Sequence, residues 1–324
     1  MPRPPSKWLH HRPLVALAPM EAITDRPYRK LVRSLCREVI LFTEFASAGG
    51  LLQGSVKVWE SVEFDDAERP IVVQLYDPFP EKLGMATREV VRHLHPDGID
   101  VNMGCPVRKV VRKGAGCGMM GERCLAVDAV RQVLDNARGT PVSIKTRLGI
   151  HDKTEVIELA QACIAEGVEQ VTIHARLKAD CPRTPADWEA LSFAARQLSV
   201  TVIGNGDIWT EDDARRMIAL EGISGVMIGR AAIGNPWLLK RCVQALNGAA
   251  VDLPPSREER VRIALEHLRL NVQCKGERRG VLEMRKVIRN YIKGSLNAKR
   301  IWLKIIQAET EKETSETLKL FAAT

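Results

Sequence analysis

The chain lacks the patterns that mark several classes of protein. Its eight cysteines include no Cys-x-x-Cys pair, which argues against zinc and iron–sulfur sites, so we expect no metal. No run of roughly 18 apolar residues is present, so no segment is expected to span a membrane. The N-terminus lacks the apolar core of a signal peptide. We therefore expect a flexible tail over residues 1–13, reduced thiols and a cytoplasmic location.

The net charge of +8 is concentrated at one end of the chain. Residues 255–324 contain 16 Lys and Arg against 9 Glu and no Asp, a net charge of +7. A nearly neutral body with a basic appendage suggests that a polyanion docks on the appendage, although a solvated helical tail would have the same composition. Pro254 and Pro255 mark the boundary, so we expect one domain over residues 14–250 and a second over 251–324.

Short runs of β-branched and apolar residues recur along the first domain, as expected of buried parallel strands. We predict strands over residues 15–18, 39–43, 71–75, 99–102, 142–146, 171–174, 201–205 and 225–228. Segments with helical periodicity lie between them, at 27–35, 81–94, 126–137, 155–166, 185–197 and 211–220. This alternation predicts an α/β fold, a (β/α)8 TIM barrel. An open doubly wound sheet is the alternative, but its Gly-x-Gly-x-x-Gly turn is missing.

Polar residues gather at the C-terminal ends of these runs, where barrels build their active sites. They are Glu44, Gln74, Asn102, Lys145, Arg147, His174, Asn205 and Arg230. Buried charge without a function is costly, so the repeated placement favours a site over core polar groups. Glycines and Arg230 after the last two strands stand where barrels bind phosphate. Cys105, just past the fourth strand, is either a buried apolar filler or a group placed to enter that site.

Together these motifs resemble, in order and spacing, the tRNA-dihydrouridine synthase family. The resemblance spans about residues 14–239, residues 284–291 are similar to the family's C-terminal part, and residues 103–116 are most similar to the bacterial B-type branch. The matching motifs are Ala18-Pro19-Met20, Thr24-Asp25, Thr43-Glu44-Phe45, Gln74, Asn102-Met103-Gly104-Cys105-Pro106, Lys145-Thr146-Arg147, His174-Ala175-Arg176, Asn205-Gly206-Asp207 and Gly229-Arg230.

The resemblance implies an FMN enzyme, recharged by NADPH, that reduces chosen uridines in tRNA to 5,6-dihydrouridine. The residues it implies for FMN binding are Ala18, Pro19, Met20, Gln74, Lys145, His174, Asn205, Gly206, Asp207, Gly229 and Arg230. Hydride from flavin N5 would add at C6 of the uracil, and C5 would then need a proton. Cys105 is the implied general acid, because a thiol with a pKa near about 8.5 is mostly protonated at neutral pH.

Asn102 and Arg147 are the candidates for uracil contacts. The chain departs from the family's pattern at Leu177 and at Cys181-Pro182-Arg183, where the family usually has Gly-Tyr-Arg, so Arg183 alone is kept as a candidate substrate contact in that loop.

The second domain is predicted to be all-α, with helices over residues 257–272, 280–293 and 298–308. In the middle helix Arg285, Lys286 and Arg289 fall on one side, opposite an apolar face. We expect this basic side to contact tRNA phosphates, and we expect a monomer.

Three alternative functions stay open. A flavoenzyme of the dihydroorotate or dihydropyrimidine dehydrogenase type would act on a free pyrimidine and would not need a basic domain. An ene-reductase would normally use a tyrosine as proton donor, and the chain has only three. A non-catalytic RNA-binding protein could use the same scaffold.

Overall fold

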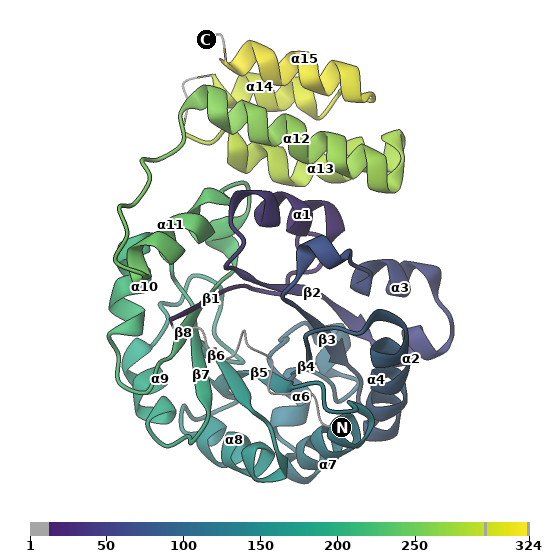
Figure 1. Ribbon diagram of the computed structural model, residues 1–324, viewed down its shortest axis with the longest axis vertical. Coiled ribbons are helices and arrows are strands. Elements are labelled where there is room, and N and C mark those ends of the chain that lie inside the picture. The colour runs from purple at the N-terminus through teal and green to yellow at the C-terminus, as the bar shows by residue number, and fades with distance from the viewer. Residues whose placement is uncertain (1–12, 295–296, 323–324) are drawn as a thin grey trace.

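Parallel strands closed into a barrel form the centre of the computed structural model, which describes residues 13–294 and 297–322. Within these residues the order is β1 to β8, with β8 paired to β1 (Figure 1). The strands are β1 (Leu14–Leu17), β2 (Ile40–Ser47), β3 (Ile71–Tyr76), β4 (Gly98–Asn102), β5 (Val142–Gly149), β6 (Gln170–Leu177), β7 (Thr201–Asn205) and β8 (Gly225–Ile228). The predicted TIM barrel is confirmed, whereas the predicted tail, except for Pro13, lies outside the described residues.

Three strands run further than their apolar sequence predicts. β2, β5 and β6 each continue for several residues into segments with polar side chains. The register with the neighbouring strand shifts inside two of these extensions, between Phe42 and Phe45 and between Arg147 and Gly149. Such irregularities bend a strand and re-aim its side chains. The extensions therefore carry Arg147 and Arg176 on strands at the barrel mouth, not on loops.

The barrel interior is apolar on one side and polar on the other. Alternate residues of β1, β2, β3, β7 and β8 form an apolar cluster of Leu14, Ala16, Ala18, Ile40, Phe42, Val72, Ile203 and Met227. Along β4 to β6, the residues that alternate with the outward-facing apolar ones are polar and buried, among them Asp100, Ser143, Gln170 and Thr172. Ser143 donates to Asp100 within this half, whereas the side-chain amide of Gln170 and the hydroxyl of Thr172 are buried without a hydrogen-bond partner among the described residues.

Helices cover the outside of the barrel. They are α1 (Arg26–Leu35), α2 (Ala48–Leu52), α3 (Val56–Val62), α4 (Pro80–Leu94), α7 (Arg123–Asn136), α8 (Glu155–Glu166), α9 (Trp188–Ala195), α10 (Glu211–Ile218) and α11 (Trp237–Leu246), with short turns η2 (Asp66–Glu68), α5 (Arg108–Val111), α6 (Cys117–Met120) and η3 (Arg230–Ala232). The prediction for α9 was too long at its start, because the Asp187 side chain accepts from Ala190 N and begins the helix at Trp188.

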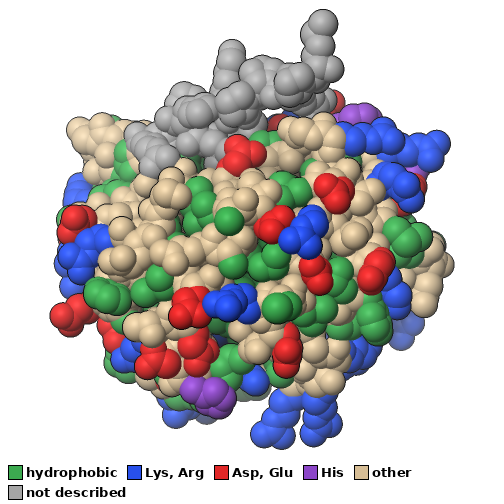
Figure 2. All heavy atoms as spheres, turned by 90° about the horizontal axis from the view of Figure 1, so that it is seen from below, with side chains coloured by type: hydrophobic (Ala, Val, Ile, Leu, Met, Phe, Trp, Pro, Cys, Tyr) green, Lys and Arg blue, Asp and Glu red, His purple; other side chains and the backbone are tan. Residues whose placement is uncertain are grey.

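The helical domain consists of α12 (Arg257–Lys275), α13 (Glu277–Tyr291), α14 (Ala298–Ile305) and α15 (Glu311–Ala322), stacked beside α1 (Figure 1). The predicted apolar face of α13 is buried, as Met284, Val287, Ile288 and Tyr291 show. The helix α15 was not predicted, because its buried side chains form only a thin stripe. At the opposite end of the molecule, acidic and basic side chains are interspersed (Figure 2).

A buried aromatic cluster joins the helical domain to the barrel. The ring of Tyr28, on α1, lies 5.3 Å from that of His267, whose Nδ1 is 3.1 Å from the Tyr291 hydroxyl. The Tyr28 hydroxyl donates to the carbonyl oxygen of Ala232 in the turn after β8. Lys275, on α12, binds the carboxylate of Asp25, which caps α1. The junction therefore touches the loops that follow both β1 and β8.

A fully buried ion pair anchors α1 to the segment before β3. The side chains of Arg29 and Glu68 are both 0% exposed, and Arg29 Nε donates to Glu68 Oε2 at 2.8 Å. Arg29 also donates to the carbonyl oxygens of Thr24 and Glu63, so each nitrogen of its guanidinium group makes a hydrogen bond. Removing one member of such a pair leaves an uncompensated buried charge.

We expect Glu68→Gln to lower the free energy of unfolding by about 3–5 kcal/mol. The matched control is Glu158→Gln, which breaks the exposed pair with Arg123 and should cost less than about 1 kcal/mol. Urea denaturation of both variants measures the two losses. Equal losses in the two variants would contradict the stabilising role assigned to the buried Arg29–Glu68 pair.

Candidate active site

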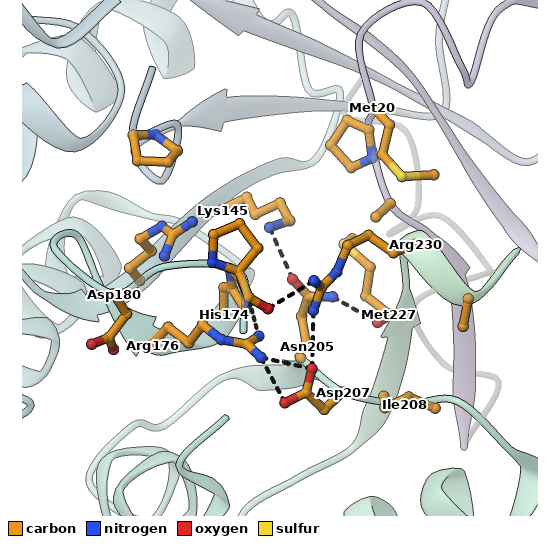
Figure 3. Close-up of a pocket in the computed structure, with 18 of the residues that line it drawn as sticks. Met20, Lys145, His174, Arg176, Asp180, Asn205, Asp207, Ile208, Met227 and Arg230 are labelled. Carbon is orange, nitrogen blue, oxygen red and sulfur yellow. Dashed lines mark hydrogen bonds and ion pairs between the residues drawn. The ribbon is translucent and has the colours of Figure 1, made fainter. Parts of the chain in front are cut away.

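A cavity opens at the barrel mouth, where the C-terminal ends of the strands meet (Figure 3). It encloses about 290 Å³, near the lower end of the range for small-molecule sites. It is lined by Ala18, Pro19, Met20, Pro106, Lys145, Arg147, His174, Arg176, Asp180, Pro182, Asn205, Gly206, Asp207, Ile208, Trp209, Met227, Gly229, Arg230 and Ala231. Of the residues predicted to bind FMN, all except Gln74 line this cavity.

One carboxylate organises the cationic end of the cavity. Asp207 accepts Arg176 Nη2 at 2.7 and 2.6 Å on its two oxygens, and Arg230 Nη2 at 3.0 Å (Figure 3). Burial alone would raise the pKa of Asp207, but the hydrogen bond from Arg176 helps to hold it below its ordinary value. Because this carboxylate is already matched by two guanidinium groups, it positions them. Any contact of the Asp207 segment with an anion would come from its backbone.

His174 is neutral and its tautomer is fixed. Its Nε2 lies 2.9 Å from Arg176 Nη1, which can only donate, so Nε2 accepts and the ring proton sits on Nδ1. Burial, followed by the charges of Lys145 and Arg147, lowers the pKa of His174 to about 2. Gly206 has a φ of +122°, and a Cβ there would lie 3.1 Å from the His174 ring. The turn after β7 therefore needs glycine at this position.

Lys145 brings an amino group to the cavity from β5. Its Nζ donates to Asn205 Oδ1 at 3.2 Å, and Asn205 Nδ2 donates to the Met227 carbonyl oxygen at 2.8 Å. Burial, and next the charge of Arg147, lowers the pKa of Lys145 to about 8. Burial therefore makes protonated Lys145 costly, and a negative ligand group beside it would relieve that cost.

Cys105 does not line the cavity itself. Its side chain is 9% exposed and belongs to a small apolar cluster with Val110 and Ala115, against which Phe45 and Tyr76 pack. The next residue along the chain, Pro106, does line the cavity. Burial raises the pKa of the Cys105 thiol above its ordinary value, so the thiol is protonated at neutral pH. The structure thus places a protonated thiol next to a cavity residue, sheltered within residues 103–118, which we name the Cys105 loop.

The two amides predicted as ligand contacts bind each other. Asn102 Nδ2 donates to Gln74 Oε1 at 2.8 Å, and Gln74 Nε2 donates to Asp100 Oδ2 at 2.7 Å. Asn102 Oδ1 accepts from Cys105 N at 3.0 Å. Gln74 is fully buried and Asn102 is 7% exposed. Neither amide lines the cavity, so their predicted roles as ligand contacts stay predictions, with a structural role beside them.

The candidate substrate arginines are in different settings. Arg147 is buried and donates to the carbonyl oxygens of Gly104 and Leu177, at 2.9 and 3.0 Å. Arg183 is exposed on the loop after β6. In the helical domain Arg285 is partly buried and donates to the Ala308 carbonyl oxygen, whereas Lys286 and Arg289, also predicted to contact tRNA, are both exposed.

Two residues that the sequence analysis did not single out hold the site together. Arg176 was noted only as part of a motif, although it contacts His174 and Asp207. Asp100 was read as part of an apolar strand, although it accepts from both Gln74 and Ser143. A signal for Asp100 existed, because it stands two residues before Asn102 and must face the same side of β4.

A closed parallel barrel with a cationic, partly apolar cavity at the C-terminal ends of its strands is the arrangement in which barrel enzymes build their active sites. The chain belongs to the dihydrouridine synthase family, because residues 16–324 match the family described as "Dihydrouridine synthase (Dus)".

Relatives agree with this assignment. The "Probable tRNA-dihydrouridine synthase" of Aquifex aeolicus is 32% identical over 301 residues, which are 92% of this chain and 93% of that protein. "tRNA-dihydrouridine synthase B" of Pseudomonas aeruginosa is 32% identical over 278 residues, covering 85% and 82%. The solved structure of TcOYE with pHBA, at 12% identity and a TM-score of 0.54, covers 78% of this chain and 92% of that one, and supports the barrel fold alone.

Burial of the Lys145 amine should affect how the free energy of unfolding changes with pH. Below pH 8 the folded and unfolded states both hold the Lys145 proton, so the full cost of burying the charge is present. Between pH 8 and 10.5 the folded state releases it first, so the free energy of unfolding rises with pH. We expect Lys145→Met to be more stable than the unaltered chain at neutral pH, by up to about 3 kcal/mol.

This gain should vanish as the pH approaches 10.5. Denaturant titrations over that range measure it, with the exposed Lys113→Met as a control that should show no gain at any pH. If Lys145→Met is less stable than the unaltered chain at neutral pH, the explanation by a costly buried charge on Lys145 is wrong.

Proposed function

We propose that this protein reduces specific uridines of tRNA to 5,6-dihydrouridine, with FMN as the bound cofactor and NADPH as the reductant. One observation carries the proposal: an apolar wall, a buried amine and an arginine-rich end share one cavity, and a protonated thiol adjoins it. The names of the relatives support this reaction, and the residues of the cavity support its chemistry. The chain acts in the cytoplasm as a monomer under this proposal.

The residues of the cavity fit FMN. Ala18, Pro19 and Met20 offer an apolar surface for a flat ring. A side chain at Gly229 would lie 3.6 Å from the Ala18 Cβ, so glycine keeps this wall open to close approach. Arg230, with the backbone of residues 205–207, would bind the phosphate, since guanidinium groups and glycine-rich turns both suit that anion.

Lys145 would stand beside the pyrimidine edge of the flavin. When bound, FMN supplies the hydride that adds at C6 of the uracil. The amino group of Lys145 would balance negative charge near flavin N1, which agrees with an amine that burial makes costly to keep charged. His174, neutral and with its proton on Nδ1, can donate one hydrogen bond there without adding charge.

Cys105 would deliver the proton to C5 of the uracil. Its raised pKa keeps the proton on sulfur until a base is present. Phe45 and Tyr76 now occupy the space beside the thiol, so the incoming nucleobase must displace part of this apolar cluster. Tyr28 and Tyr291 are fully buried at the domain junction and line no part of the cavity, so an ene-reductase on this scaffold would have to use Tyr76, which packs against the Cys105 cluster.

We expect Cys105→Ala to keep its yellow flavin and still be reduced by NADPH, while dihydrouridine formation falls by about 10²–10⁴-fold, the usual contribution of a general acid. Flavin absorbance, stopped-flow reduction and mass spectrometry of the tRNA measure the three quantities. Cys124→Ala, at an exposed position on α7, is the matched control and should behave as the unaltered enzyme. Full turnover by the Cys105 variant would exclude it as the acid.

Deletion of the gene tests the reaction itself. We expect tRNA from cells lacking the protein to have uridine at one or more positions that otherwise carry dihydrouridine, by nuclease digestion and mass mapping. A colourless purified protein together with an unchanged tRNA map would instead favour a non-catalytic RNA-binding protein.

The helical domain would hold the tRNA. Lys286 and Arg289 are exposed on α13 and free to meet phosphates, whereas Arg285 also serves as a link to the turn after α14. A uridine of folded tRNA must leave its stack to reach the barrel cavity, so a second region has to hold the rest of the molecule.

Lys286→Glu/Arg289→Glu should weaken tRNA binding and reduce its salt dependence, because each lost phosphate contact releases one counterion fewer. Flavin content should not change. Arg88→Glu/Arg92→Glu, on the exposed side of α4, makes the same change in net charge and is the control. Filter binding at several salt concentrations decides the matter, and equal losses in both variants would mean that only net charge counts.

A further inference from the structure

We propose that Asp100 is a positioning residue, whose carboxylate sets the donor–acceptor direction of a hydrogen-bond chain that runs through Gln74 and Asn102 and holds the Cys105 loop in place. The inference rests on the proposed function in one respect, that Cys105 is the proton donor.

The chain of contacts is continuous from the barrel interior to the loop. Ser143 Oγ donates to Asp100 Oδ1 at 2.6 Å, and Gln74 Nε2 donates to Asp100 Oδ2 at 2.7 Å. Gln74 Oε1 accepts from Asn102 Nδ2 at 2.8 Å. Asn102 Oδ1 then accepts from Cys105 N at 3.0 Å. Asp100 and Gln74 are 0% exposed, so water cannot replace any of these partners at the inner end of the chain.

Only one direction of donation is possible while Asp100 is ionised. A carboxylate has no proton to give, so Gln74 must turn its NH₂ group toward Asp100 and its oxygen toward Asn102. Asn102 must then offer its NH₂ group to that oxygen, which leaves Oδ1 for the Cys105 loop. Burial raises the pKa of Asp100 to about 6, and the nearby charge of Lys145 opposes the rise, so the group is ionised at neutral pH.

The outer end of this hydrogen-bond chain, at Asn102, determines how the backbone of Cys105 is held. Asn102 Oδ1 receives the N–H groups of both Gly104 and Cys105. On the other side the Cys105 carbonyl oxygen accepts from Cys117 N at 3.0 Å. The backbone of Cys105 is therefore held from two sides, and one of the two holds depends on the orientation of a single amide.

A neutral amide in place of Asp100 would remove the directionality. An asparagine at this position could present its NH₂ group to Gln74, which would let Gln74 turn its oxygen inward. Asn102 would then meet an NH₂ group, turn its own oxygen toward it, and face the Gly104 and Cys105 N–H groups with a donor. Two donors that face each other in a buried site repel, so the backbone of Cys105 loses one of its two holds.

The test measures how well the thiol is sheltered. Full-length protein, as purified, is treated with iodoacetamide, and the rate of alkylation is followed by mass spectrometry for each cysteine peptide. We expect Asp100→Asn to speed alkylation of Cys105 by at least about fivefold, the effect of one lost hydrogen bond. Ser143→Ala keeps the carboxylate as acceptor for Gln74, so its Cys105 rate should match that of the unaltered chain.

Cys163 and Cys242, both 0% exposed and far along the chain from this loop, are internal controls for unfolding. Their rates should not change in Asp100→Asn. If they rise in parallel with Cys105, the variant has only lost stability and the proposal fails. It also fails if the Cys105 rate is unaltered.

A compensating exchange separates directionality from mere packing. In Asp100→Asn/Gln74→Glu the carboxylate moves one position along the chain, accepts from the new asparagine and from Asn102, and so restores the original orientation of Asn102. We expect this double variant to return the Cys105 alkylation rate toward that of the unaltered chain. A rate as fast as in the single variant would overturn the proposal. None of these rates depends on tRNA reduction, so the outcome is separate from that of the proposed function.

Discussion

Lys145, His174 and Arg176 reach the barrel mouth from the neighbouring strands β5 and β6, and burial there opposes a positive charge on the first two. The result is a lysine with a pKa of about 8 and a histidine with a pKa of about 2. Asp207 stabilises the arginines that remain charged. The cavity thus holds cations whose burial is only partly compensated. Under the proposed function, this imbalance would favour the binding of an anionic cofactor.

Several residues at the barrel mouth support the backbone and also belong to the candidate site. Gln74 and Asn102 bond to each other, and Asn102 also accepts from the backbone of the Cys105 loop. Arg147 offers its charge to the cavity while it supports two backbone carbonyl groups. Substitutions at these positions will therefore alter loop geometry together with ligand contacts, and kinetics alone cannot separate the two effects.

The sequence was sufficient for the barrel and for most of the cavity, because parallel strands of similar length deliver their C-terminal residues to one end. The sequence could not predict which side chains bind each other. Asp207 was expected beside a phosphate, but in three dimensions its carboxylate meets Arg176 and Arg230. Helical periodicity placed Arg285 on an exposed face, yet a turn that is distant in sequence brings the Ala308 carbonyl oxygen to it. The shelter around Cys105 likewise depends on side chains from β2 and β3.

The junction of Tyr28, His267 and Tyr291, together with the Lys275–Asp25 pair, leaves the helical domain little freedom to swing against the barrel. The distance from the basic face of α13 to the barrel mouth is then fixed by the fold. Under the proposed function, the enzyme acts on a uridine whose distance from the phosphates held by α13 matches this fixed distance. The base of that uridine must also be able to leave its stack without a large change in the rest of the RNA. The RNA, and not the protein, must then do most of the bending.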